Sequence, residues 1–306
     1  MKNLILTAII FYFAVFNIAN SQEVKGVALG DTLLNNGDLI GAIAEYQKAY
    51  LENPANEEAS YSLACAFSLN RQTDSAIKYL FVYISLDTTS YPLYNPDFLQ
   101  ARENKGWGDF EDKLIQGLMK KFNNPYKDIE YSKTLWKMRA LDQAYYREME
   151  ITQRKIGMNS TVVMAIWDLK ERINKQNVKD LEELIETKGW PKKSQVGESA
   201  AGTAFLVIQH SSYELQKKYL PVIKKLCEES EARWEDYALM YDRIQVNENK
   251  PQKYGSQIKY NNDTKSFELF PLEDESKVDE WRKEVGLGNL AGYVARWGIT
   301  FKPKNK

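Results

Sequence analysis

The feature that most constrains the fold is an internal repeat of 34 residues near the start of the chain, in which residues 23–56 align with residues 57–90. The recurrent positions of the first copy hold Leu29, Gly30, Leu33, Ala42, Tyr46, Ala49 and Pro54. The same positions of the second copy hold Leu63, Ala64, Phe67, Ala76, Leu80, Tyr83 and Thr88. Self-similarity at a fixed period of this kind indicates stacked units that bury their apolar faces against one another.

This pattern resembles the tetratricopeptide repeat, a pair of packed helices. Gly30 and Ala64 are small at the positions where the two helices of a pair would approach closely. Pro54 would end the second helix, because proline cannot continue the helical hydrogen-bond ladder. Residues 36–38 (Asn-Gly-Asp) are the expected turn between the helices. The resemblance predicts two helix hairpins over residues 23–90.

Two repeats are fewer than the roughly three that an independent stack usually needs. Residues 91–124 begin like a third repeat but lose its signature, so we expect a degenerate cap there. Trp107, Phe110 and Leu114 stand at i, i+3 and i+7, which predicts one amphipathic helix in this cap. Two roles stay open for the repeats: they bind a protein or peptide partner in a concave groove, or they are only a strut.

The first residues of the chain predict export. Lys2 is followed by an apolar run over residues 4–16 that only Thr7 interrupts, and residues 19–21 (Ala-Asn-Ser) are the small residues that a signal peptidase recognises. The apolar run is shorter than the roughly 20 residues that span a bilayer. We therefore expect a signal peptide over residues 1–21 and a periplasmic or secreted protein without a membrane span.

Charge and cysteine content narrow the classes of partner. The 306 residues include 42 acidic and 41 basic ones, a formal net charge of -1. No overall field therefore favours nucleic acid or an anionic membrane. We expect the two cysteines, Cys65 and Cys227, to be small buried side chains, although a disulfide between them stays open in an exported protein.

Residues 125–298 are expected to form a helical domain. Apolar residues recur at three- and four-residue steps within residues 128–175, as on one face of a helix. Asn177 is expected to cap a helix over residues 178–188. Further helices are expected at about 198–210, 213–230, 234–247, 275–285 and 289–297, before a tail of residues 299–306.

One strand signal interrupts the helical pattern. Ile258 and Tyr260 alternate with polar residues, as do Phe267 and Leu269, on either side of residues 261–264. This spacing predicts a small β-hairpin. The predicted fold class is therefore mainly α, with a tetratricopeptide helix-hairpin stack followed by a helical domain that contains one small β-hairpin.

Short motifs are arranged in order along the C-terminal domain. They are Met138-Arg139 with Asp142-Gln143 and Arg147; Gly189-Trp190-Pro191 with Val196-Gly197-Glu198; Gln209-His210; Asp242-Arg243; Gln252-x-Tyr254-Gly255-x-Gln257; and Val278-Asp279 with Arg282 and Val285-Gly286-Leu287. In this order and spacing the set resembles a bacterial domain family of unknown function, the one numbered 6624. The resemblance covers about residues 125–298, with Ser256 where that family usually has threonine. It implies no reaction, because the family has no established activity.

His210 is the only histidine and stands at the end of an apolar helix. Its ordinary pKa suits a general acid or base, so it is the candidate catalytic residue. A histidine at a helix C-terminus is also favoured by the helix macrodipole when it is charged, which would be a purely structural role. Both interpretations stay open.

The candidate ligand-binding residues are polar side chains of the motifs. They are Asp142, Gln143, Arg147, Asp242, Arg243, Gln252, Tyr254 and Gln257. Gln143 and Arg147, four residues apart, would share a helix face. Together with Arg139 and Asp142 they would form a polar surface that is either solvated or lines a polar pocket. Residues 252–257 form a glycine-containing loop, which is a common place for binding residues. Alternatively, their side chains satisfy backbone groups where the helix meets the hairpin.

The sequence has no glycine-rich phosphate loop, dinucleotide fingerprint or nucleophile elbow. One histidine and two distant cysteines cannot supply a zinc site of the usual spacing, so we expect neither a metal nor a cofactor. The favoured function is a non-catalytic exported binding or scaffolding protein, with a protein or peptide partner on the repeats and a small ligand in the C-terminal domain. The alternative is an enzyme of unassigned reaction that uses a polar pocket around His210.

Overall fold

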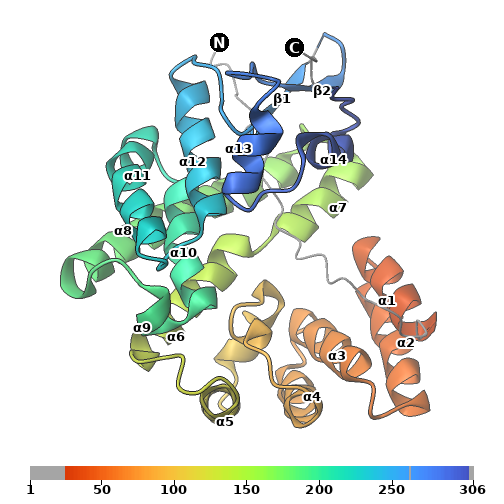
Figure 1. Ribbon diagram of the computed structural model, residues 1–306. Helices are drawn as coiled ribbons and strands as arrows, with labels where there is room; N and C mark the ends of the chain where they lie inside the picture. Colours follow the sequence, from red (N-terminus) through yellow and green to blue (C-terminus); the bar gives the residue numbers. More distant parts are fainter. Residues whose placement is uncertain (1–24, 262, 303–306) are drawn as a thin grey trace. The chain divides into compact units, whose positions relative to one another are not determined.

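A computed structural model describes residues 25–261 and 263–302 (Figure 1). These residues are mainly helical, with one two-stranded antiparallel sheet, which confirms the predicted fold class. The predicted signal peptide lies outside the described residues. Within the described part, no helix has both the length and the apolar character needed to cross a membrane. The chain divides into two compact units, and the division falls between Val207 and Ile208.

The first unit begins with two successive helix hairpins (Figure 1). Their helices are α1 (Lys25–Asn35), α2 (Leu39–Glu52), α3 (Glu57–Leu69) and α4 (Thr73–Leu86). Asp38 begins α2 by accepting the backbone N–H of Gly41, and Asn56 begins α3 by accepting that of Ala59. The hairpins lie within the residues where the repeat pattern predicted them, and their assignment as tetratricopeptide repeats stays a prediction.

Helices α1 and α2 approach closely at Gly30. A Cβ atom at this position would lie 2.3 Å from a ring carbon of Tyr46. Tyr46 is buried, and its hydroxyl donates a hydrogen bond of 2.6 Å to the carboxylate of Asp31. The small residue of the repeat pattern therefore makes room for the aromatic residue of the same repeat.

The predicted cap over residues 91–124 consists of three short 3-10 helices and one α-helix. They are η1 (Tyr91–Leu93), η2 (Pro96–Phe98), η3 (Ala101–Glu103) and α5 (Trp107–Lys121). Trp107, Phe110 and Leu114 are buried on one face of α5, which confirms the predicted amphipathic helix. Asn104 ties the cap to α4, because its amide donates 2.9 Å and 2.7 Å hydrogen bonds to the side chains of Thr73 and Asp74.

The first unit continues with further helices. They are α6 (Ile129–Gln143), α7 (Tyr146–Ile156), α8 (Thr161–Lys188) and α9 (Lys193–Val196), followed by α10 (Glu198–Gln209), whose last two residues belong to the second unit. The predicted N-cap at Asn177 is wrong. The α8 helix begins after Ser160, whose hydroxyl accepts the backbone N–H of Val163, and it continues through position 177. The Asn177 side chain is buried and donates to the Met138 carbonyl instead.

The second unit contains the predicted hairpin. Its elements are α11 (Tyr213–Glu228), α12 (Trp234–Asn247), β1 (Ile258–Asn261), β2 (Ser266–Leu269), α13 (Val278–Glu284), α14 (Leu290–Val294) and η4 (Ala295–Trp297). The strands pair antiparallel with Ile258 opposite Leu269 and Asn261 opposite Ser266. Cys227 in this unit and Cys65 in the first unit are both buried, and neither forms a disulfide, as expected of small core side chains.

Gly30→Ala is expected to lower the free energy of unfolding by about 1–3 kcal/mol, because the added methyl group would overlap the Tyr46 ring. The matched control is Gly108→Ala in α5, where nothing lies within 4 Å of the added methyl group. This control should gain up to about 1 kcal/mol from helix propensity. Urea unfolding followed by circular dichroism measures both, and equal stabilities would contradict the close approach of α1 and α2.

Candidate functional site

The motif residue Asp242 holds the loop of residues 252–257 from inside. Its carboxylate, which is fully buried on α12, accepts the backbone N–H groups of Lys253 at 2.8 Å, Tyr254 at 3.0 Å and Ser256 at 2.9 Å. Burial raises the pKa of Asp242, and these hydrogen bonds act in the opposite direction by favouring the charged form. The carboxylate therefore fixes the path of the loop.

The two glutamines of the loop bond within it. The buried Gln252 side chain donates to the carbonyls of Gln257 and Phe270, each at 3.0 Å, and accepts the Gln257 N–H at 2.8 Å. The Gln257 amide donates to the Ser256 hydroxyl at 3.0 Å. These contacts match the alternative in which the motif side chains satisfy backbone groups at the junction between helix and hairpin.

Arg282 and two tyrosines complete this network. Arg282 donates to the Tyr254 carbonyl at 2.6 Å and to the Gly288 carbonyl at 2.6 Å. Its guanidinium lies 4.9 Å from the ring centre of Tyr293, whose hydroxyl donates to the Ser256 carbonyl at 2.9 Å. The Tyr254 side chain is buried in a small apolar cluster, and this burial raises its pKa. The structure thus brings Asp242, Gln252, Tyr254 and Gln257 together around one loop.

Arg243 and His210 lie near the end of α10. Arg243 donates to the Gln209 carbonyl at 2.9 Å, and Gln216 donates to the same carbonyl at 3.1 Å. Both side chains therefore satisfy a carbonyl that the helix end leaves without a partner in the helix. His210 follows directly and is half-buried. This position agrees with the structural interpretation of His210, and its catalytic role stays a prediction.

The predicted shared face of Gln143 and Arg147 is wrong. Helix α6 ends at Gln143, and Tyr145 adopts a left-handed conformation with φ of 70° before α7 begins. Arg147 instead forms an ion pair of 2.6 Å with Asp97. The solvated interpretation of this polar face is wrong for Asp142, which is 0% exposed and accepts a 2.6 Å hydrogen bond from the Gln143 amide.

Lys170 of α8 is a buried amine beside Asp142 that the sequence did not indicate. It is 1% exposed, and its Nζ donates to the Asp142 carbonyl and lies 3.9 Å from the ring centre of Tyr146. Burial lowers the pKa of Lys170 to about 8. The Lys170 amine therefore loses its positive charge at a pH close to neutral.

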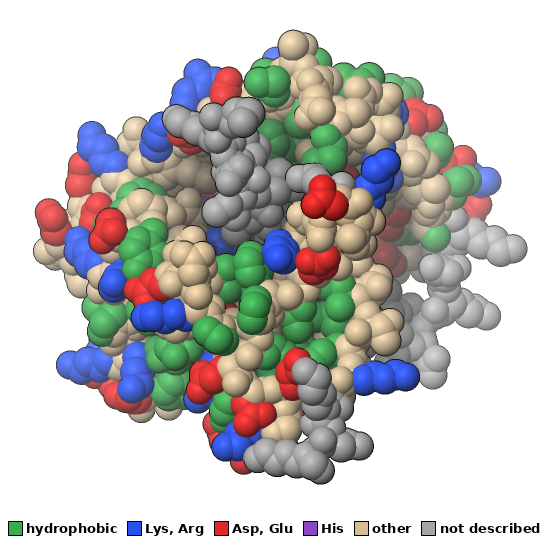
Figure 2. Space-filling model, turned by 90° about the horizontal axis from the view of Figure 1, so that it is seen from above, with side chains coloured by type: hydrophobic (Ala, Val, Ile, Leu, Met, Phe, Trp, Pro, Cys, Tyr) green, Lys and Arg blue, Asp and Glu red, His purple; other side chains and the backbone are tan. Residues whose placement is uncertain are grey.

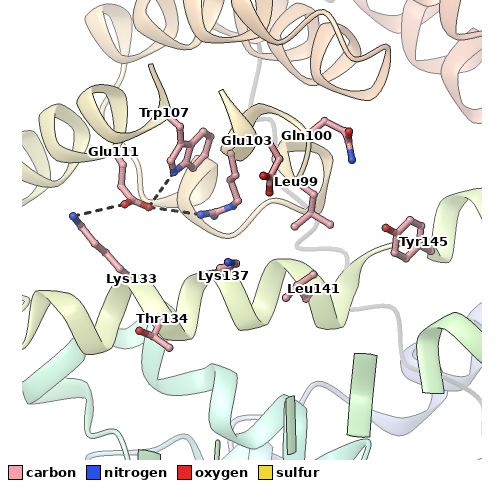
Figure 3. A pocket seen from close by; sticks show the side chains of 11 residues that line it. Leu99, Gln100, Glu103, Trp107, Glu111, Lys133, Thr134, Lys137, Leu141 and Tyr145 are labelled. Carbon is pink, nitrogen blue, oxygen red and sulfur yellow. Dashed lines mark hydrogen bonds and ion pairs between the residues drawn. The ribbon is translucent and has the colours of Figure 1, made fainter. Parts of the chain in front are cut away.

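The first unit also contains a cleft of about 620 Å³ between the cap and α6 (Figure 3). This volume lies in the range of ordinary ligand sites, about 300–1,000 Å³. The cleft is lined by Leu99, Gln100, Arg102, Glu103, Trp107, Glu111, Lys133, Thr134, Lys137, Leu141 and Tyr145. Residues 99–111 form one wall and α6 forms the other, so aliphatic, aromatic and charged groups of both signs face the same space.

Glu111 joins the two walls. Its carboxylate lies 3.6 Å from Arg102 Nη1 on its own wall and 3.7 Å from Lys133 Nζ on α6. It also accepts a 3.3 Å hydrogen bond from the Trp107 indole N–H, and Figure 3 shows all three contacts meeting at this carboxylate. One carboxylate therefore neutralises parts of two cations that come from segments on opposite sides of the cleft.

Arg102 is a buried cation in the wall of the cleft. Its side chain is 8% exposed, and its guanidinium lies 4.5 Å from the Trp107 ring centre. Nη2 donates to the Leu93 carbonyl, whereas Nε has no hydrogen-bond acceptor within the described part of the chain. Burial lowers the pKa of Arg102 to about 10. Its capacity to donate hydrogen bonds is thus only partly used.

Lys137 and Glu103 are exposed charges on opposite walls of the cleft (Figure 3). Lys133, Lys137 and Leu141 follow one another at four-residue steps, so they lie along one face of α6. No ion pair joins Lys137 or Glu103 to another of the residues that the structure describes, whereas Lys133 pairs with Asp112 at 2.8 Å. The free charges of the cleft are therefore one ammonium and one carboxylate.

The family described as Family of unknown function (DUF6624) matches residues 130–302. The chain belongs to this family. The match includes nearly all of α6, whereas residues 99–111 of the opposite cleft wall precede it. No curated protein and no solved structure matches the chain. Membership in this family therefore identifies the C-terminal domain but implies no reaction. It supports the resemblance that the motifs indicated.

Sequence reasoning missed the cleft because its two walls meet only in the folded chain. One local signal was available on α6. Lys133 and Lys137 are like charges at i and i+4, an arrangement that destabilises a helix slightly, on a face that continues to Leu141. Two lysines that repel each other on a face that ends in an apolar side chain indicate that an anionic group lies nearby. Glu111 is one such anionic group.

Lys170→Met is expected to change how stability depends on pH. The pKa of Lys170 is about 8 in the folded chain against an ordinary 10.5, so the unfolded chain binds more protons between these values. The free energy of unfolding of the natural chain should therefore rise relative to Lys170→Met, by up to about 3 kcal/mol, as pH rises from 8 to 10.5. Urea unfolding of both proteins at several pH values measures this, and a constant difference would contradict the burial of the charged amine.

Proposed function

We propose that the protein is an exported, non-catalytic binding protein whose cleft between residues 99–111 and α6 holds an extended peptide segment. The observation that carries this proposal is the cleft itself, in which Glu111 fixes two walls that present apolar and charged side chains to one space. Binding surfaces of this kind combine apolar contact with a few placed polar groups.

The shape of the cleft supports an extended ligand. Its lining runs along α6 from Lys133 to Leu141, a rise of eight residue steps of helix, or roughly 12 Å. This is the length of about four residues of extended chain. Leu99, Leu141 and Tyr145 are half-buried along this length and offer apolar contact to such a segment.

The proposal also takes the helix hairpins before the cleft to be tetratricopeptide repeats. This assignment rests on the 34-residue pattern together with helices α1–α4 at the matching positions. In this proposal they hold the cap that forms one wall, through the bonds of Asn104 to α4. The hairpins thus act as the support of the binding site, and a further partner on them is a separate surface.

Export and the absence of catalysis are also parts of the proposal. The pattern of residues 1–21 supports export.

The internal hydrogen bonds of Asp242, Gln252 and Gln257 support a non-catalytic role, because these side chains fix a loop rather than face one another around a substrate. Charged side chains of both signs are interspersed on the face shown in Figure 2, which agrees with the small net charge and offers no single-sign surface for nucleic acid.

Thr134→Trp tests the cleft as the binding site. Thr134 is exposed on α6 and lines the cleft, so a bulky ring at this position would fill it. The probes are capped synthetic hexapeptides, screened against the chain beginning at Gln22 and measured by fluorescence anisotropy. We expect Thr134→Trp to weaken the peptides that bind by at least about tenfold, which corresponds to about 1.4 kcal/mol.

Thr187→Trp is the matched control. Thr187 is also exposed on a helix, and both threonine hydroxyls donate a 2.9 Å hydrogen bond to the carbonyl four residues earlier. The control should bind as the natural chain does. Peptide binding that is equally strong in the two variants, or no binding by any hexapeptide, would overturn the proposal.

A further inference from the structure

We infer that the cleft selects a peptide segment with an acidic side chain, whose carboxylate lies between Lys137 and Lys133 and faces Arg102. This inference rests on the proposed function and adds the chemistry of the ligand. The lining contains three cations, Arg102, Lys133 and Lys137, and two carboxylates, Glu103 and Glu111. Asp112 lies outside this lining and also pairs with Lys133, so Lys137 is the cation of the lining that no ion pair compensates within the described part of the chain.

The half-buried Lys133 and the exposed Lys137 of α6 provide the more accessible part of this anion site. Lys133 and Lys137 stand at i and i+4, so their ammonium groups repel each other along one face of the helix. Lys133 is compensated by Glu111 at 3.7 Å and Asp112 at 2.8 Å. Lys137 has no such ion pair in the described part of the chain. A carboxylate between the two lysines would relieve the repulsion and give Lys137 its missing partner.

Arg102 provides the buried part of the site. Its Nε has no acceptor among the residues that the structure describes, and its Nη1 lies 3.6 Å from Glu111, which is longer than the usual 2.7–2.9 Å of a charge-assisted hydrogen bond. Glu111 is shared among three donors at 3.3–3.7 Å, so it cannot serve any one of them fully. Buried donors without acceptors cost free energy, and a ligand carboxylate that entered between the walls would supply a second anionic partner.

Glu103 limits where the acidic group can lie. It stands on the wall opposite α6 and beside Leu99, nearer to Lys137 than to Lys133 in Figure 3. Its carboxylate would repel a second acidic residue at that end of the segment. The charge pattern that fits the cleft is therefore one acidic residue between Lys133 and Lys137, followed by apolar residues, with a neutral or basic residue near Glu103.

The test uses capped hexapeptide libraries in which one position is fixed as Glu, Gln or Lys and the other positions are mixed. The Glu library should bind the chain beginning at Gln22 at least about tenfold more tightly than the Gln and Lys libraries. Lys137→Glu should abolish this preference, and Lys137→Arg should keep it because the charge remains. The matched control is Lys48→Glu, since Lys48 is an exposed lysine of α2 for which the structure gives no ion pair, and it should keep the preference.

The outcomes separate the two proposals. Suppose that Thr134→Trp blocks binding. If the Glu and Gln libraries then bind equally well, or if Lys137→Glu leaves binding unchanged, the acidic ligand is overturned and the peptide-binding cleft is not. Binding that Thr134→Trp does not affect, or no binding of any library, would overturn the proposed function itself. Added salt should weaken the Glu library most, since salt screens exposed charges.

Discussion

The cleft of the first unit depends on the carboxylate of Glu111. Trp107 and Arg102 approach it from the cap, and Lys133 approaches it from α6, a segment more than 20 residues further along the chain. Without this carboxylate, a buried guanidinium and an ammonium group would face each other with only Asp112 and Glu130 near the lysine. Because one buried ion must be compensated by another, Glu111 determines that the cap and α6 meet here and leave a space between them.

The two units use buried carboxylates in different ways. Asp242 is saturated by backbone N–H groups at 2.8–3.0 Å, so the loop that it holds has little remaining capacity for a ligand. Glu111 is shared among donors at 3.3–3.7 Å, and the Nε of Arg102 has no acceptor in the part of the chain that the structure describes. A saturated network stabilises a structure, whereas donors that are only partly satisfied next to a cleft are available to a ligand. This difference is why we place binding in the first unit, although most of the family motifs lie elsewhere.

The sequence predicted the features that depend on local patterns. The period of the repeat located Gly30 against Tyr46, and the apolar spacing located α5. The alternation of apolar and polar residues within 258–260 and 267–269 located the hairpin. Each of these signals acts within one or two elements. The same local reasoning failed at Asn177. Its side chain resembles an N-cap, but a buried contact with the Met138 carbonyl, 39 residues away, lets the helix pass through it.

The candidate site was less predictable for the same reason. A left-handed residue, Tyr145, separates Gln143 from Arg147, and aromatic residues rarely adopt this conformation, so no helical period could indicate the break. Arg102 and Glu103 carry no pattern of their own. Their place in a cleft follows from the cap folding back on α6, which is a property of tertiary structure. The family match begins at residue 130, so the motifs could not indicate this wall either.

The indole N–H of Trp107 is the most direct reporter of the cleft, because it donates to Glu111 between the two walls. Spectra of the chain with ¹⁵N-labelled tryptophan, assigned with Trp107→Phe and Trp136→Phe, would follow this signal during titration with the Glu hexapeptide library. The Trp136 indole, which donates to the Ser199 hydroxyl at 2.9 Å away from the cleft lining, is the internal control. We expect the Trp107 signal to shift saturably with the Glu library and less with the Gln library, while the Trp136 signal stays unchanged. A peptide that binds without moving the Trp107 signal would contradict the central claim.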